Sequence, residues 1–381
     1  MTGKSETTSV AVEAGGAIPS ISAGQIIAFY LFDVAERIDL ELVPALVSGP
    51  AVAARLAPKP ATPPYVQYEK PPISFDGAAV GIPEFDDFQV RFRAYDYGVI
   101  SIALSRGLRG DWPELLTIGQ TLIENAEFEQ RAEGLCRQIL GRIRSALVGV
   151  RDRLLSEDYL VYVVHALDRP MSADELVVTR GEAIATMLRG ERQPLSDQEK
   201  TTILRHRLSY LADDLVIPTW NAAFVYDTPT GAQAAIEILE FANSQLLEFR
   251  YYDQLLDDKL AAIYARLQRP TWYDEWIGSH YTRAARQVHS LFIDINELTD
   301  RTENTLKFIG DIYAARLFGL VADRLGLETW KANVQEKLKT LGDVYRFAVE
   351  QSSLSRGQFL ELAIVLILIL ELALVLMGVM K

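Results

Sequence analysis

The stretch that decides the fold is 235–267, AIEILEFANSQLLEFRYYDQLLDDKLAAIYARL. Positions in it that recur at alternating steps of four and three are apolar at nine of ten places, and Asp253 is the exception. This spacing is typical of a long helix that packs along a partner helix. Pro270 ends the run. The positions are 235, 239, 242, 246, 249, 253, 256, 260, 263 and 267.

Two further helices are predicted after this one. A second heptad frame runs from Val288 to Ile312, and we expect it to form a long antiparallel, coiled-coil-like hairpin with the first helix over 228–350. A third helix is predicted from about 328. No proline follows it, so we expect it to continue towards the end of the chain.

The residues before the hairpin predict an α+β domain over 23–227. Strands are expected over 25–35, over 88–104 with a turn at Tyr95–Gly98, and over 158–168, while Trp112-Pro113 opens a helix predicted to reach about 155. With a short amphipathic helix expected over 36–47, the order strand, helix, strand, strand, helix, strand is that of a ferredoxin-like α/β sandwich. Capping boxes at Ser172 and Ser196 predict two more helices, and 215–227 has strand character. Residues 1–22 are small and polar, and we expect them to be disordered.

The end of the chain predicts a transmembrane helix. Residues 359–380, FLELAIVLILILELALVLMGVM, would span about 33 Å as a helix, which matches a hydrocarbon core of about 30 Å. Basic residues are more frequent before this span than after it, which places the N-terminal part in the cytoplasm. The expected localisation is therefore a single-pass, tail-anchored membrane protein, in the inner membrane if the source is bacterial, with the lipid bilayer as partner through 359–380.

Two acids interrupt this apolar run, Glu361 near its start and Glu371 close to its middle. An acid at mid-membrane usually faces a partner helix or water, which makes both residues candidates for an oligomer contact. The alternative is a polar defect that a strongly apolar helix tolerates. Asp253 is a third candidate, since a polar residue in a heptad seam can fix register or partner choice. Its alternative is a water-facing gap in a curved hairpin.

Composition and motifs exclude several classes of function. The 381 residues carry 38 Lys+Arg against 51 Asp+Glu, a formal net charge of −13, which argues against a general nucleic-acid binder. One cysteine, Cys136, leaves no internal disulfide or CxxC pair. The four histidines lack metal-ligand spacing, and no GxGxxG, GxxxxGK[ST] or GxSxG is present. We therefore expect no metal and no cofactor.

Two groups of charged residues remain as alternatives. One group is three arginines at a spacing of seven residues, Arg137, Arg144 and Arg151. They could form a basic helical face that binds lipid headgroups or RNA on a ribosome. The alternative is a solvated face balanced by nearby Glu. An enzyme of unknown class would instead need a cleft between the α+β domain and the hairpin. The side chains that would have to converge there are Glu248, Arg250, Asp253, His206 and His289.

Several blocks of the sequence resemble a known family. AFVYDTPTGAQAAIEILEFANSQLLEFRYYDQLLDDKLAAIYARL, NTLKFIGDIYAARLFGL and the apolar tail are similar to the family that includes the "required for meiotic nuclear division" proteins and YagE-like proteins. The resemblance covers roughly 25–380. Because the N-terminus is not an Arg- and Ser-rich, transit-like segment, we expect a bacterial member. The resemblance implies no catalytic residue. For its mitochondrial members, the resemblance implies support of translation at the inner membrane.

Together these features predict a membrane-anchored, non-enzymatic scaffold or assembly factor. We expect it to form a homo-oligomer and to present the α+β domain to an unknown protein partner. The alternatives are the enzyme of unknown class and the ribosome- or RNA-associated factor.

Overall fold

The computed structural model describes residues 19–48, 71–82, 87–268, 291–293, 295, 296, 299 and 312–376. Outside this described part lie residues 1–18, residues 49–70, most of the second heptad frame and His289. The predictions of N-terminal disorder and of the second hairpin helix therefore stay predictions.

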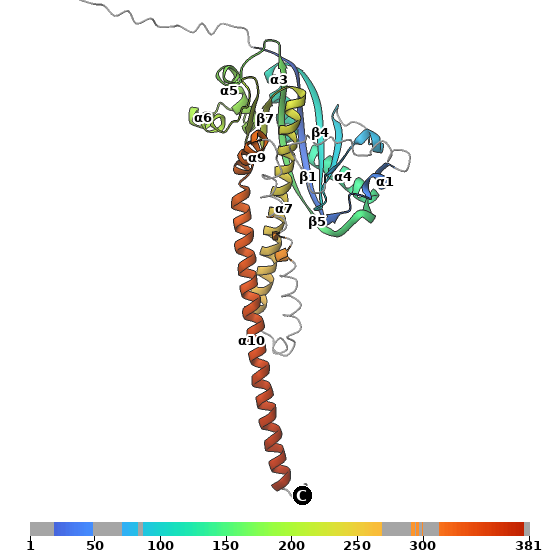
Figure 1. Ribbon diagram of the computed structural model, residues 1–381, viewed down its shortest axis with the longest axis vertical. Coiled ribbons are helices and arrows are strands. Elements are labelled where there is room, and N and C mark those ends of the chain that lie inside the picture. The colour runs from blue at the N-terminus through green and yellow to red at the C-terminus, as the bar shows by residue number, and fades with distance from the viewer. Residues whose placement is uncertain are drawn as a thin grey trace, which may run out of the picture.

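A seven-stranded sheet forms the centre of the α+β unit (Figure 1). Its order is β2-β3-β4-β1-β5-β7-β6, and every neighbouring pair is antiparallel except β5 and β7. The strands are β1 (Ile21–Ile38), β2 (Ile73–Asp76), β3 (Gln89–Ala94), β4 (Val99–Gly110), β5 (Leu147–Leu167), β6 (Leu215–Pro218) and β7 (Ala222–Tyr226).

Helices cover both faces of this sheet. The helices are α1 (Val43–Ser48), α3 (Trp112–Glu124), α4 (Ala126–Arg142), α5 (Ala173–Arg189), α6 (Asp197–Arg205), α7 (Pro229–Gln268), α9 (Ile312–Leu325) and α10 (Leu327–Leu376). Two short 3-10 turns are η1 (Gly77–Val80) and η2 (Arg144–Ala146). One core lies between the sheet and α1, α3, α4, α5 and α6, and the other lies between the sheet and α7, α9 and α10.

Strand β1 shows why the sheet is buried on both sides. Ala28 and Tyr30 belong to the first core, while Phe29 and Leu31 belong to the second. Alternate side chains of a strand point to opposite faces, so a strand between two helical layers needs apolar residues at both parities. This explains the continuous apolar run of this segment.

Local signals fix several helix ends. The Asp111 side chain accepts a hydrogen bond from Glu114 N at the start of α3, and Pro113 occupies the first turn. Ser172 and Glu175 form a complete capping box at the start of α5, and Ser196 caps α6. These starts agree with the sequence predictions.

The α+β class is confirmed, but the sheet is larger than a four-stranded ferredoxin-like sandwich. Strands β2, β6 and β7 extend it at both edges. The helix predicted from Trp112 to about 155 is also too long. Helix α4 ends at Arg142 and β5 begins at Leu147, ahead of the predicted strand start at 158. Here β-pairing with β1 overrides the local helical pattern.

The predicted transmembrane helix at 359–380 is contradicted. Across the described residues, no helix has both the length and the apolar character needed to cross a membrane. The apolar run instead forms the distal part of α10, a continuous helix of 50 residues whose first half packs in the second core through Val334, Leu338 and Leu341. Glu361 and Glu371 interrupt the run in sequence. The predictions of a tail anchor and of a single-pass membrane localisation are corrected by this finding.

Helix α10 continues far past the sheet, and the C-terminus lies at its distal end (Figure 1). This confirms the predicted third helix. Its upper part lies against α7, the first hairpin helix.

Candidate functional site

The most unusual part of the described structure is a strip of buried polar residues on α7. Every residue from 235 to 249 is buried, since the sheet covers one side of the helix and α9 and α10 cover another. A helix in such a position is normally apolar on all sides. Here the buried set includes Glu237, Glu240, Asn243, Ser244, Gln245 and Glu248.

Arg93 of β3 neutralises the first two of these acids. Its guanidinium lies 2.7 Å from the Glu240 carboxylate and 3.6 Å from that of Glu237, and its Nε donates to Ser74 Oγ at 2.9 Å. Burial raises the pKa of Glu237, although the positive charge of Arg93 and a hydrogen bond from Gln233 oppose the shift. One buried cation thus serves two buried carboxylates.

A neutral contact follows one turn later on α7. The Tyr97 and Ser244 hydroxyls are 2.6 Å apart, and the Ser244 hydroxyl donates to Phe241 O at 2.6 Å. Tyr97 therefore donates to Ser244. Asn243 donates through Nδ2 to Leu239 O at 2.8 Å within the helix.

A second buried cation, Arg151 of β5, lies further along the strip. Its Nε donates to both carboxylate oxygens of Asp33, at 3.2 and 3.1 Å, and its guanidinium carbon lies 3.8 Å from the centre of the Tyr251 ring. Asp33 is fully buried, and burial raises its pKa to about 6 even though Arg151 lowers it. Glu248 also acts electrostatically on Arg151.

Towards the C-terminal end of α7 the charged side chains are partly exposed. Arg250 forms an ion pair with Glu157 of β5. Lys337 of α10 lies 2.8 Å from Asp253 and 2.7 Å from Asp257, so it links α10 to α7. Asp253 is thus paired within the chain, and its predicted role in partner choice remains a prediction.

The residues of the enzyme hypothesis do not converge in the described part of the chain. Glu248 lies near Arg151, Arg250 pairs with Glu157, and Asp253 pairs with Lys337. His206 is half-buried at the end of α6, where its Nδ1 lies 2.9 Å from Thr202 O. Among the described residues no group of His, Cys, Asp and Glu has an arrangement that could hold a metal ion.

The three arginines of the predicted basic face lie in three different elements. Arg137 is exposed on α4 and pairs with Glu133 at 2.5 Å. Arg144 is exposed in η2, and Arg151 lies in β5 with its side chain 9% exposed. The seven-residue spacing holds only along a helix, and α4 ends before the second of them.

The distal part of α10 exposes large apolar side chains. Glu361 and Glu371 belong to this part of α10, but their side chains lie outside what the structure describes. Five described side chains there are each more than half exposed, namely Ile364, Val365, Ile367, Leu368 and Ile369.

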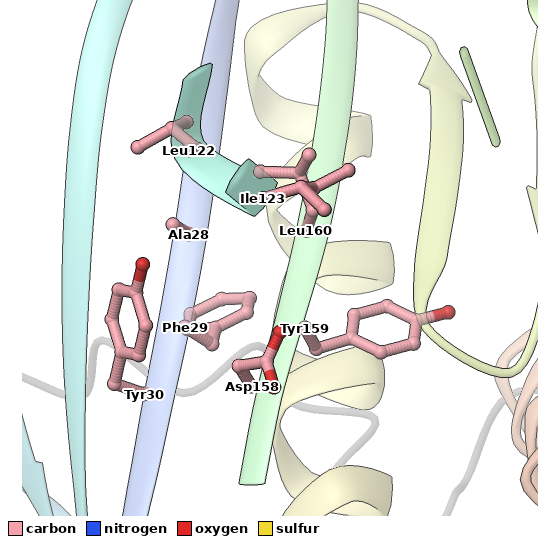
Figure 2. Close-up of a pocket in the computed structure, with 8 residues that line it drawn as sticks. All are labelled: Ala28, Phe29, Tyr30, Leu122, Ile123, Asp158, Tyr159 and Leu160. Atoms are coloured by element: carbon pink, nitrogen blue, oxygen red, sulfur yellow. The ribbon is translucent and has the colours of Figure 1, made fainter. Parts of the chain in front are cut away.

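A small surface notch lies on the other face of the sheet, where the end of α3 meets β1 and β5 (Figure 2). Its empty space is about 220 Å³, part of it open to solvent. The lining residues are Ala28, Phe29, Tyr30, Leu122, Ile123, Asp158, Tyr159 and Leu160. Tyr30 is buried and Asp158 is exposed.

Sequence reasoning missed Asp33, Arg93, Tyr30 and Asp158. A weak signal was present for the first two, because Asp33 interrupts the apolar run IIAFYLFDVA and Arg93 occupies an inward position of an alternating strand. A charged residue at a core position usually has a buried partner of opposite sign. No sequence signal identifies that partner, since Asp33 and Arg151 are 118 residues apart.

Comparison with known proteins gives a family and no activity. A family described as "Uncharacterized protein MJ0711, N-terminal domain" matches residues 23–233, which include the whole sheet except the first two residues of β1. A relative, "Uncharacterized protein MJ0711" of Methanocaldococcus jannaschii, is 23% identical over 223 residues, which are 58% of this chain and 66% of the relative. The match thus spans slightly less than two thirds of that relative. No solved structure matches the chain. Because this match covers more than half of the chain, the chain belongs to the family of the MJ0711 N-terminal domain.

Proposed function

We propose that the protein is a non-enzymatic scaffold or assembly factor that self-associates through the distal part of α10. Self-association leaves the α+β unit free to meet a protein partner. The observation that carries this proposal is the set of five apolar side chains between 364 and 369, which are 53–62% exposed.

The placement of these side chains supports association between chains. At 3.6 residues per turn they occupy roughly 200° of the helix circumference, so more than half of the helix surface is apolar there. A patch of this kind on a protein surface is typical of an interaction site. Covering it would remove about 1 kcal/mol of unfavourable hydration for each half-exposed side chain.

A second copy of the chain suits this surface because the same segment supplies both partners. Two α10 helices packed side by side make a self-complementary interface, as in most homodimers. The first half of α10 is fixed to α7 by the Lys337 contacts and by core packing. The distal half is therefore presented at a defined place.

We further propose that the family extends to the "required for meiotic nuclear division" and YagE-like proteins, with this chain as a bacterial member. Support comes from the similarity of several sequence blocks in the same order, including the α7 sequence. A member of that group with a different strand order in its sheet would contradict this relationship.

Size-exclusion chromatography with light scattering tests the self-association. We expect the full chain to be oligomeric and the double variant Ile364→Glu, Leu368→Glu, altered on one face of α10, to be monomeric. Val178→Glu is the matched control, since Val178 is 85% exposed on α5 and its change should leave the oligomer intact. A full chain that is monomeric at about 100 μM, or a double variant with an unchanged mass, would overturn the proposal.

A further inference from the structure

The loop that joins α6 to β6 exposes large apolar side chains although its backbone is firmly held. Tyr210 and Leu211 are 68% and 61% exposed. The buried Asp214 carboxylate accepts hydrogen bonds from both of their backbone N–H groups, at 2.7 and 2.6 Å. Pairing of Leu208 with Val216 fixes the base of the loop. A loop that is already ordered loses little conformational entropy on binding, so these side chains are suited to contact a partner.

Helix α9 continues this surface. The ring centres of Tyr210 and Tyr313 are 5.4 Å apart, and the neighbouring Ile312 is 81% exposed. Arg316 and Gly319 are exposed on the same face of α9, one and two turns further on. Figure 1 shows that α9 lies near α6, at the opposite end of α10 from the C-terminus. We call Tyr210, Leu211, Ile312, Arg316 and Gly319 the α9 surface.

Gly319 indicates that another backbone approaches this helix. A Cβ built at this position would meet no atom within 4 Å, so packing within the described part of the chain does not require a glycine there. Glycine inside a helix lowers stability relative to alanine. Its advantage on a helix surface is that a second backbone can come close. The α9 surface therefore suits a helix as its partner.

The charges of the α9 surface favour an acidic partner. Arg316 and Arg205, the last residue of α6, are both exposed, and neither forms an ion pair with a described residue. The whole chain has a formal net charge of −13, so these exposed cations contrast with the rest of the protein. Asp213, also exposed in the loop, acts electrostatically on Asp227 before α7. Asp323 lies at the far end of α9, so acidic residues of a partner should gather near Arg316.

We propose that the α9 surface binds an acidic amphipathic helix of a protein partner. Its apolar side chains cover Tyr210, Leu211 and Ile312, and its carboxylates face Arg316. Tyrosine and arginine are frequent in the energetically dominant parts of protein interfaces. The inference rests on the proposed function, in which the protein meets a protein partner away from its self-association surface. The stretch of α10 from Leu327 to Ile364 spans about 55 Å, which separates α9 from the distal part of α10.

Fluorescence anisotropy of a labelled synthetic peptide tests the proposal on the full chain. The peptide is a helix of about 18 residues with leucine along one face and glutamate elsewhere. We expect a dissociation constant of about 10–100 μM. A second peptide with lysine in place of every glutamate should bind at least about tenfold more weakly, because its charge repels Arg316. No saturation of the acidic peptide by about 1 mM, or equal binding of the two peptides, would overturn the proposal.

Variants assign the binding to α9. Gly319→Leu should weaken the acidic peptide about tenfold or more, while the urea midpoint stays equal or rises, because leucine favours a helix more than glycine does. Gly134→Leu is the matched control, since Gly134 is exposed on α4 with equally open space, and its binding should be unchanged. Arg316→Glu should reverse the preference between the two peptides. Unchanged affinity in Gly319→Leu, or an unchanged preference in Arg316→Glu, would overturn the proposal.

The same variants separate this inference from self-association. The double variant Ile364→Glu, Leu368→Glu should bind the acidic peptide as the parent chain does, whatever its mass in light scattering. Loss of peptide binding in this double variant would place the peptide on α10 and overturn the proposal. Loss of the oligomer in Gly319→Leu would identify a second copy of the chain as the occupant of the α9 surface, which would also overturn it. A monomeric parent chain that binds the peptide through α9 would contradict self-association alone.

Discussion

Replacing Arg151 with methionine tests whether buried charge holds β5 and α7 to β1. Met has an unbranched side chain that fills part of the same space without the charge. In the native protein Arg151 donates to both oxygens of Asp33 and lies against the Tyr251 ring. The variant leaves the fully buried Asp33 carboxylate without its cation, and Glu36 and Glu248 nearby carry the same sign as Asp33.

The expected loss depends on pH. Asp33 has a pKa of about 6 in the fold against 3.8 for the ordinary group, so ionising it in the fold costs about 3 kcal/mol relative to the unfolded chain. Because the pKa of Asp33 is higher in the fold than in the unfolded chain, protonation of Asp33 stabilises the folded state. This stabilisation is complete below pH 3.8 and is lost as pH rises through about 6. Removing Arg151 removes a charge that lowers this pKa, so the pKa rises further and the pH dependence becomes steeper.

Urea unfolding of the parent chain and of Arg151→Met at about pH 7.5 and about pH 5 measures this loss. We expect a loss of about 3–5 kcal/mol at the higher pH, where a buried charge is left uncompensated. At the lower pH a protonated Asp33 needs no cation, and we expect a loss of about 1–2 kcal/mol from hydrogen bonding and packing.

Two controls make this result specific. The double variant Asp33→Asn, Arg151→Met should recover stability at about pH 7.5 relative to Arg151→Met, because no buried charge remains. Arg137→Met removes an exposed ion pair with Glu133, whose side chains are 67% and 41% exposed, and should cost less than about 1 kcal/mol. Equal losses for Arg151→Met at both pH values, or no recovery in the double variant, would refute the reasoning.

Three further predictions concern backbone and thiol chemistry. Gly98→Ala should lower the free energy of unfolding in urea by more than about 3 kcal/mol, since the φ of Gly98 is 93° and a Cβ there would lie 1.8 Å from Ala35 O. Gly81→Ala is the control: φ is 73° but the space around it is open, so we expect a loss of only about 1 kcal/mol. Equal losses in the two variants would contradict this. Ser172→Ala should cost about 1 kcal/mol through loss of the α5 cap, and an unchanged urea midpoint would show that the cap contributes nothing. Burial raises the pKa of Cys136 to about 12, so Ellman's reagent at about pH 8 should label it only in denaturant, and rapid labelling of the native chain would disprove its burial.

Some features of the fold follow from local sequence. The turn at Tyr95–Gly98 joins β3 and β4 because Gly98 adopts a positive φ that other residues rarely take. The starts of α3, α5 and α6 follow from capping side chains a few residues away. Helices α7 and α10 could be predicted as long helices, since their periodicity is sustained over many turns without an interior proline.

Other features depend on partners distant in the chain. The heptad pattern of α7 predicted one packed face, but the structure buries the helix on all sides over 235–249. The polar residues Glu240 and Ser244 lie opposite Arg93 of β3 and Tyr97 of the turn between β3 and β4. Without those partners in view, such a strip is indistinguishable in sequence from a solvated helix face.

The sequence by itself determined the starts of α3, α5 and α6 and the turn before β4, because caps and turns act over a few residues. Only the tertiary structure decided that Arg151 lies in strand β5 rather than on a basic helix, since the pairing of β5 with β1 and the charge of Asp33 come from more than a hundred residues away. It also decided that Tyr30 and Asp158 meet at one notch. Strand pairing and burial between distant segments determine which charged side chains form ion pairs. The residues next to a charged side chain in the sequence do not determine this.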